Sequence, residues 1–66
     1  MDTIIKKDVN RYLLMLLGRY ELIERWWDSP NRAFQNRTPD AVYQTGPKGR
    51  VEVYTYVSRC AGGVGS

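Results

Sequence analysis

The sequence predicts an all-α domain, a small bundle of about four short helices, and three observations support this. Apolar residues recur at helical spacing through the first half of the chain. Proline, glycine and asparagine separate these segments from two further ones. Only one segment alternates with the period of a β-strand, and a lone strand would leave its backbone groups without partners. At 66 residues the chain is a single domain whose stability is marginal.

The first expected helix covers residues 3–17. Asp2 or Thr3 can cap its start, and Gly18 suits the left-handed position that follows a helix. The residues expected to share its apolar face are Ile5, Val9, Tyr12, Leu13, Leu16 and Leu17.

The second expected helix covers residues 19–28 and ends before Pro30. Its apolar stripe ends in two adjacent tryptophans, Trp26 and Trp27. Neighbouring residues on a helix point about 100° apart, so both cannot face the core equally. We expect Trp26 to anchor the core and Trp27 to be partly exposed, where it can contact a partner.

Residues 30–37 are expected to form a loop that Phe34 anchors to the core. The sequence Thr38-Pro39-Asp40 then has the features of a helix start, with a capping threonine and a proline in the first turn. A short helix from Pro39 to about Gln44 should bury Val42.

Residues 47–59 are ambiguous. Alternating valines and threonine favour a strand locally, whereas Val53 and Val57 lie one helical turn apart. Because nothing else in the chain could pair with a strand, we favour a helix. Residues 1–60 then form the domain, and residues 61–66 (AGGVGS) form a flexible tail.

The composition argues against catalysis and metal binding. The chain has no histidine, its carboxylates show no paired spacing, and its single cysteine, Cys60, permits neither a disulfide nor a cysteine cluster. We therefore expect no enzyme activity, metal or cofactor. One cysteine fits a reducing, cytoplasmic setting, and the longest apolar run, residues 12–17, is too short to span a membrane.

Several residues together resemble the toxin-binding domain of the Xre/MbcA/ParS antitoxin family over roughly residues 18–62. Two positions depart from the family pattern: Asn36 replaces a glycine, which Asn can imitate in the left-handed conformation, and Trp27 replaces an aliphatic residue. The matching residues are Trp26, Pro30-Asn31, Phe34, Arg37-Thr38-Pro39, Val42, Gly49, Val53 and Val57.

The resemblance implies a small helical domain that binds and blocks a partner toxin. The usual partner is a RES-domain enzyme that degrades NAD or transfers a group from it. Family antitoxins can place their C-terminal tail in that enzyme's active site, and residues 58–66 are the matching segment here. Many members also carry an N-terminal helix-turn-helix domain, whereas this chain begins almost at the toxin-binding part.

Two functional hypotheses follow. The first is a protein-binding module, an antitoxin-like inhibitor of a toxin or, in a phage or mobile element, of a host enzyme. Its candidate partner-binding residues are Trp27, Arg25, Arg32, Arg37 and Arg59, although these arginines can equally be solvated.

The alternative is a small nucleic-acid-binding or transcription-regulating protein. The net charge of +3 permits this, but the cations are scattered along the chain. Steep salt dependence of binding would distinguish this alternative from an apolar protein interface. Exposed aromatic residues would also allow a homodimer.

Overall fold

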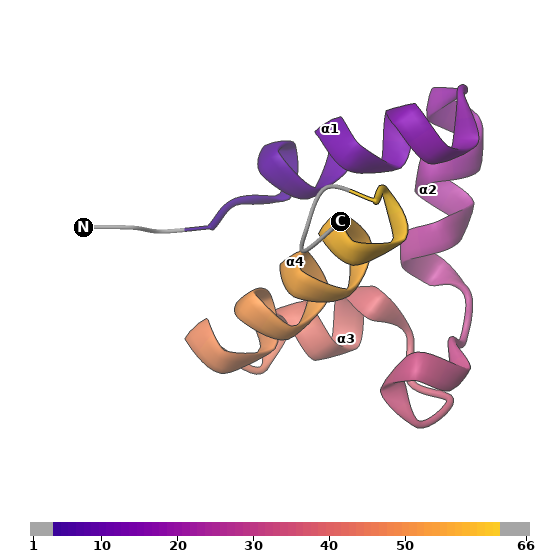
Figure 1. The fold of residues 1–66 in the computed structure, drawn as a ribbon. Coiled ribbons are helices and arrows are strands. Elements are labelled where there is room, and N and C mark those ends of the chain that lie inside the picture. Colours follow the sequence, from indigo (N-terminus) through magenta and orange to yellow (C-terminus); the bar gives the residue numbers. More distant parts are fainter. Residues whose placement is uncertain (1–3, 63–66) are drawn as a thin grey trace.

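The computed structural model describes residues 4–62, which fold into four α-helices and one 3-10 turn (Figure 1). The elements are α1 (Lys6–Leu17), α2 (Tyr20–Asp28), η1 (Arg32–Phe34), α3 (Pro39–Gln44) and α4 (Pro47–Cys60). Each α-helix packs against the next along the chain, and α4 returns to pack against α1, so the four form a closed ring around one core. The predicted all-α class is confirmed.

Local capping chemistry sets the ends of α1. The helix begins at Lys6 rather than at residue 3 because Asp8 caps it: the Ile5 N–H donates to the Asp8 carboxylate at 3.3 Å. The expected caps Asp2 and Thr3, and most of the expected tail, lie outside the described residues. Gly18 ends the helix in the left-handed conformation, with φ of 79° and its N–H donating to the Leu14 carbonyl at 2.8 Å.

The segment between α2 and α3 closes on itself. The Asn31 N–H donates to the Arg37 carbonyl and the Asn36 N–H donates to the Asn31 carbonyl, both at 3.0 Å. Asn36 is left-handed, with φ of 64°, as expected where the family has glycine, and Gln35 is left-handed as well. Phe34 points into the core from η1 and holds this segment against the helices.

The helical interpretation of residues 47–59 is confirmed, against their local strand propensity. Val53 and Val57 are buried one turn apart on α4, and Gly49 lies one turn before them. A Cβ atom at Gly49 would lie only 1.9 Å from the Val42 carbonyl oxygen of α3. The contact between α3 and α4 therefore requires glycine here, and this packing outweighs the β preference of the valines.

The start of α1 is fastened to α3. The Lys6 ammonium lies 2.6 Å from the Asp40 carboxylate, and the Tyr43 hydroxyl donates to the Ile4 carbonyl at 3.2 Å. The hydrogen bond from Lys6 lowers the pKa of Asp40, in spite of some opposing desolvation. Both side chains of the ion pair stay partly exposed, so its contribution is modest and screened by salt.

We expect Gly49→Ala to destabilise the domain by about 1–3 kcal/mol, because the new methyl group would force α4 away from α3. Urea unfolding followed by far-UV circular dichroism measures this. Lys48→Ala, at an exposed position one residue earlier on α4, should stay near wild type. A more stable Gly49→Ala variant, the usual result at an open helical glycine, would contradict the close contact.

We expect Asp40→Asn to reduce the acid sensitivity of folding. Because the pKa of Asp40 is lowered in the folded state, the pair stabilises the fold above the unfolded pKa of about 3.9, and this contribution is lost as the pH falls through the folded pKa. Asp40→Asn should lose less than about 1 kcal/mol at neutral pH and almost nothing in acid. Urea unfolding of wild type, Asp40→Asn and the surface control Glu24→Gln between neutral pH and about pH 2 checks this. If the free energy of unfolding falls by the same amount in acid for all three proteins, the ion pair has no role in acid sensitivity.

Candidate protein-binding site

Trp27 is buried, with 6% of its surface exposed, and Trp26 is half-buried. The expectation that Trp27 is partly exposed is therefore wrong: Trp27 is the more deeply buried of the two, while Trp26 packs against the core and keeps part of its surface in solvent. The reason is a long-range hydrogen bond: the Trp27 indole N–H donates to the Asn10 side-chain oxygen of α1 at 2.8 Å. Asn10 thus satisfies the indole N–H of the buried Trp27, and this favours Trp27 for the core.

Aromatic rings connect this buried tryptophan to the rest of the molecule. The Trp27 ring makes edge-to-face contacts with Trp26 at 5.2 Å and with Tyr43 of α3 at 5.5 Å between ring centroids. Trp26 makes a further edge contact with Phe34 at 6.4 Å. Such contacts add stability beyond simple burial, so both tryptophans and the single Phe fasten the α2–α3 segment to the core.

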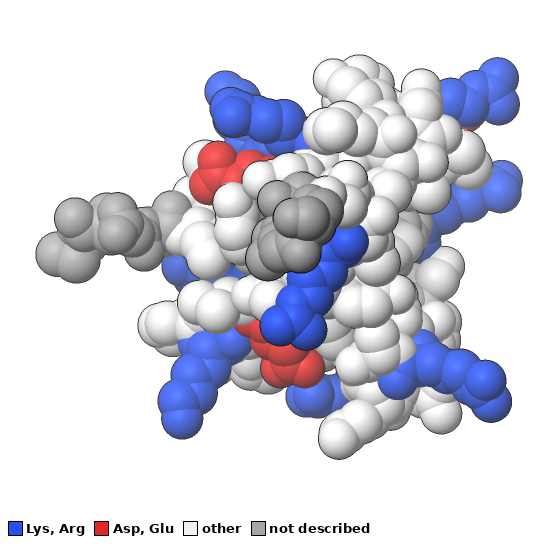
Figure 2. Space-filling view, in the orientation of Figure 1, with Lys and Arg blue, Asp and Glu red and all other residues white. Residues whose placement is uncertain are grey.

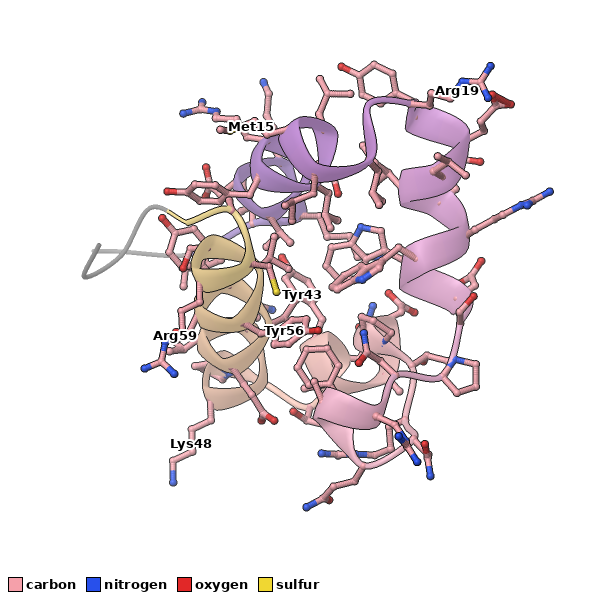
Figure 3. The ribbon with its side chains drawn as sticks, turned by 45° about the vertical axis from the view of Figure 1, so that its right-hand side comes forward. Met15, Arg19, Tyr43, Lys48, Tyr56 and Arg59 are labelled. Atoms are coloured by element: carbon pink, nitrogen blue, oxygen red, sulfur yellow. The ribbon has the colours of Figure 1, made fainter. Side chains whose placement is uncertain are left out.

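The four candidate arginines are all exposed, but they do not form one cluster. Arg25 lies on α2, Arg32 begins η1, and Arg59 lies in the last turn of α4. Arg37 has a structural contact, because its Nε–H donates to the Phe34 carbonyl at 3.2 Å. In Figure 3 the Arg59 side chain projects away from the body of the molecule, as does Lys48 at the other end of α4.

One of these arginines borders a groove between η1 and α4, which we call the η1–α4 groove. It has a volume of about 330 Å³. Phe34 and Tyr56 form an aromatic base, with ring centroids 5.3 Å apart. Two opposite charges, Glu52 and Arg59, lie two turns apart along α4. The residues that line the groove are Ala33, Phe34, Glu52, Thr55, Tyr56 and Arg59.

The aromatic base of the groove is electrically neutral. A hydrogen bond with the Cys60 thiol is the main cause that raises the pKa of Tyr56; burial also raises it, and the Asn31 side chain acts in the opposite direction. The phenol is therefore protonated at neutral pH and can both donate and accept a hydrogen bond. Tyr56 also packs against the hydrophobic core, and it lies on the inner side of α4 in Figure 3.

An apolar base with a few polar and charged groups at its edge is typical of a protein interface. Of the five candidate partner-binding residues, only Arg59 lines this groove. Sequence reasoning missed Glu52, Thr55 and Tyr56, although a signal was present: they share one face of α4 with Arg59 at three- and four-residue spacing.

Residues 4–62 contain no group of three His, Cys, Asp or Glu side chains that could hold a metal ion. A membrane-spanning helix is also absent from this part of the chain, because every helix there is too short or too polar.

We expect Trp27→Ala to cost on the order of 3–5 kcal/mol, because it removes the buried ring and leaves Asn10 without its partner. Trp26→Ala, on the same helix, should cost clearly less because its ring is only partly buried. Urea unfolding of the two variants makes the comparison. The opposite order of stabilities would contradict the orientation of α2.

Comparison with known proteins gives one match. A family model described as the antitoxin Xre/MbcA/ParS C-terminal toxin-binding domain matches residues 8–63, a range that includes most of α1 and all of the later helices. No curated protein and no solved structure matches the chain significantly.

Proposed function

The chain belongs to the Xre/MbcA/ParS antitoxin C-terminal toxin-binding domain family, and we propose that it neutralises a partner toxin by binding it directly. The partner class that we propose is a RES-type enzyme acting on NAD, or a host enzyme if the chain serves a phage or mobile element. The observation that supports this most is the family match over residues 8–63, which extends through the η1–α4 groove to the end of the last helix.

We propose that the partner contacts the η1–α4 groove and the end of α4. Arg59 and Cys60 are exposed in the last turn of α4, whereas Ser58 just before them is buried, so the helix end faces the core on one side and solvent on the other. A partner side chain that enters the groove would lie on Tyr56, above the buried ring of Phe34, and between Glu52 and Arg59. Residues 58–66, the segment that matches the C-terminal tail of the family antitoxins, begin at this point.

The other arginines have secondary places in this proposal. Arg32 precedes the groove residue Ala33 in the chain, so it can extend the interface from η1. Arg25 is exposed on α2 and Arg37 supports the loop backbone, and neither lines the groove. We assign Trp27 an indirect role, because its burial leaves it to position the helices that carry the contact residues.

This proposal involves no catalysis by the chain, whose sequence has no histidine. It places the protein in the cytoplasm, where a toxin acting on NAD would find its substrate. The face shown in Figure 2 favours a protein partner over nucleic acid, because its Lys and Arg side chains stand apart, most of them near the edge, with uncharged and acidic surface between them.

The test is co-expression of the chain with a RES-domain enzyme from the same host, with cell growth and NAD content as readouts. Calorimetry with a catalytically inactive enzyme then gives the affinity and stoichiometry. Wild type should restore growth and bind. Arg59→Ala should weaken binding by roughly tenfold or more, because an interfacial arginine is a frequent hot spot.

Lys48→Ala is the matched control, because Lys48 is an exposed cation at the opposite end of the same helix. It should bind like wild type. A wild-type chain that neither binds nor protects against RES-domain enzymes would refute the proposed partner class. Equal loss in Arg59→Ala and Lys48→Ala would show that the interface lies elsewhere.

A further inference from the structure

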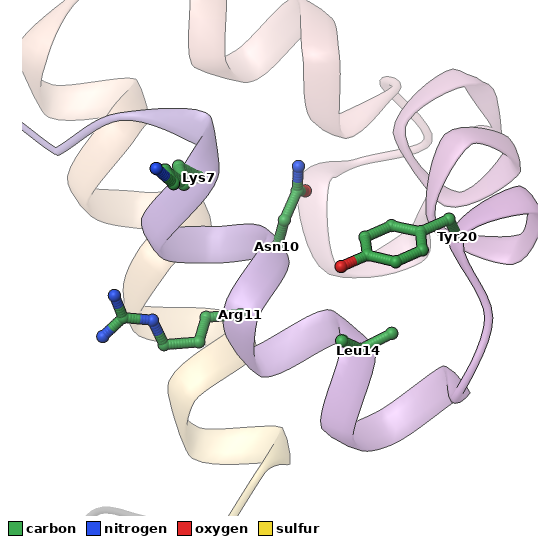
Figure 4. A pocket seen from close by; sticks show the side chains of 5 residues that line it. All are labelled: Lys7, Asn10, Arg11, Leu14 and Tyr20. Carbon is green, nitrogen blue, oxygen red and sulfur yellow. The ribbon is translucent and has the colours of Figure 1, made fainter.

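We propose that a second surface of this domain, between α1 and α2, binds an acidic segment of a partner protein that carries one apolar anchoring side chain. The surface is a groove of about 450 Å³, which we call the α1–α2 groove (Figure 4). It shares no lining residue with the η1–α4 groove. The residues that line it are Lys7, Asn10, Arg11, Leu14 and Tyr20.

The polar side of this groove consists of hydrogen-bond donors. Lys7 and Arg11 are exposed cations one turn apart on α1. Asn10, between them in the chain, accepts the Trp27 indole N–H with its side-chain oxygen, so the amide nitrogen is the end that can serve a ligand. The hydroxyl of Tyr20 can donate as well. No lining residue is a carboxylate, so the groove is suited to a ligand rich in acceptors.

The cations of the groove have no ion-pair partner among the described residues. In residues 4–62 the ion pairs join Lys6 with Asp40 and Arg19 with Glu21. Neither Lys7 nor Arg11 takes part in an ion pair there. A carboxylate from outside can therefore pair with either cation without displacing an internal partner.

The other side of the groove is apolar and unusually exposed. Tyr20, at the start of α2, leaves 68% of its surface in solvent, and its ring lies beside Leu14 (Figure 4). Met15 is 70% exposed and lies one turn beyond Arg11, so it continues the same row of α1. Large exposed apolar side chains gathered beside charges are typical of an interaction surface.

The order of these groups along α1 indicates how the segment would lie. Lys7 and Arg11 would pair with carboxylates, and the apolar anchor would pack between Leu14 and Tyr20. Nucleic acid fits less well, because two cations neutralise few phosphates and Glu21 directly follows Tyr20.

A random peptide library displayed on phage, selected on the immobilised wild-type chain, tests this proposal. We expect enriched peptides in which Asp or Glu stands next to an aromatic or aliphatic residue. Nitrogen-15 NMR titration with an enriched peptide should shift resonances of the α1–α2 groove and leave the η1–α4 groove unchanged. Lys7→Glu should lower the affinity for the peptide by about tenfold, since it replaces attraction of the peptide's carboxylates by repulsion.

The matched control is Lys48→Glu, which makes the same charge change on the exposed part of α4 and should alter the affinity by less than about twofold. Replacement of the peptide's acidic residues by their amides should abolish binding. The proposal is overturned if no acidic motif is enriched, if the amide peptide binds equally well, if shifts map to α4, or if a single-stranded oligonucleotide displaces the peptide from this groove. Because the two grooves share no residue, none of these results alters the toxin-binding test.

Discussion

The hydrogen bond from the Trp27 indole to Asn10 is the interaction on which the rest of the structure depends. A tryptophan can be buried this deeply in so small a domain only if its N–H has a partner, and Asn10 supplies one from another helix. The bond fixes the rotation of α2 against α1, and the ring then contacts Tyr43 of α3 and lies 4.7 Å from the Lys6 ammonium. Both proposed binding surfaces depend on this bond. It orients Asn10 in the α1–α2 groove, and it turns Trp26 toward Phe34, which lies beneath the η1–α4 groove.

The fold could be predicted from the sequence where local chemistry decides it. Gly18 ends a helix because glycine tolerates the left-handed conformation, and Thr38 caps α3 by accepting the Ala41 N–H at 3.1 Å. The rotation of α2 could not be predicted in this way. Trp26 and Trp27 lie on adjacent rows of one apolar stripe, and the choice between them depends on Asn10, a residue of another helix that lies 17 positions away in the sequence.

The candidate site was predictable only in part, for a related reason. A single sequence predicts that arginines lie at the surface, and all four candidate arginines are exposed. It does not show that Arg59 lines one groove together with Phe34 and Tyr56, because that arrangement requires η1 to pack against α4. Gly49 is a partial exception: its spacing to Val53 and Val57 was visible, and the close contact with the Val42 carbonyl explains why glycine is needed there. The family adds the class of partner, and the geometry shows where such a partner could lie.

Hydrogen exchange of the two indole N–H groups, followed by nitrogen-15 NMR, tests the central role of Trp27 most directly. The account predicts that the Trp27 indole proton exchanges only when the whole domain unfolds, because it is buried and bonded to Asn10. The Trp26 proton should exchange faster, since that side chain is only partly buried. Protection of Trp26 instead, or fast exchange of both protons, would contradict the arrangement of the helices and the two surfaces derived from it.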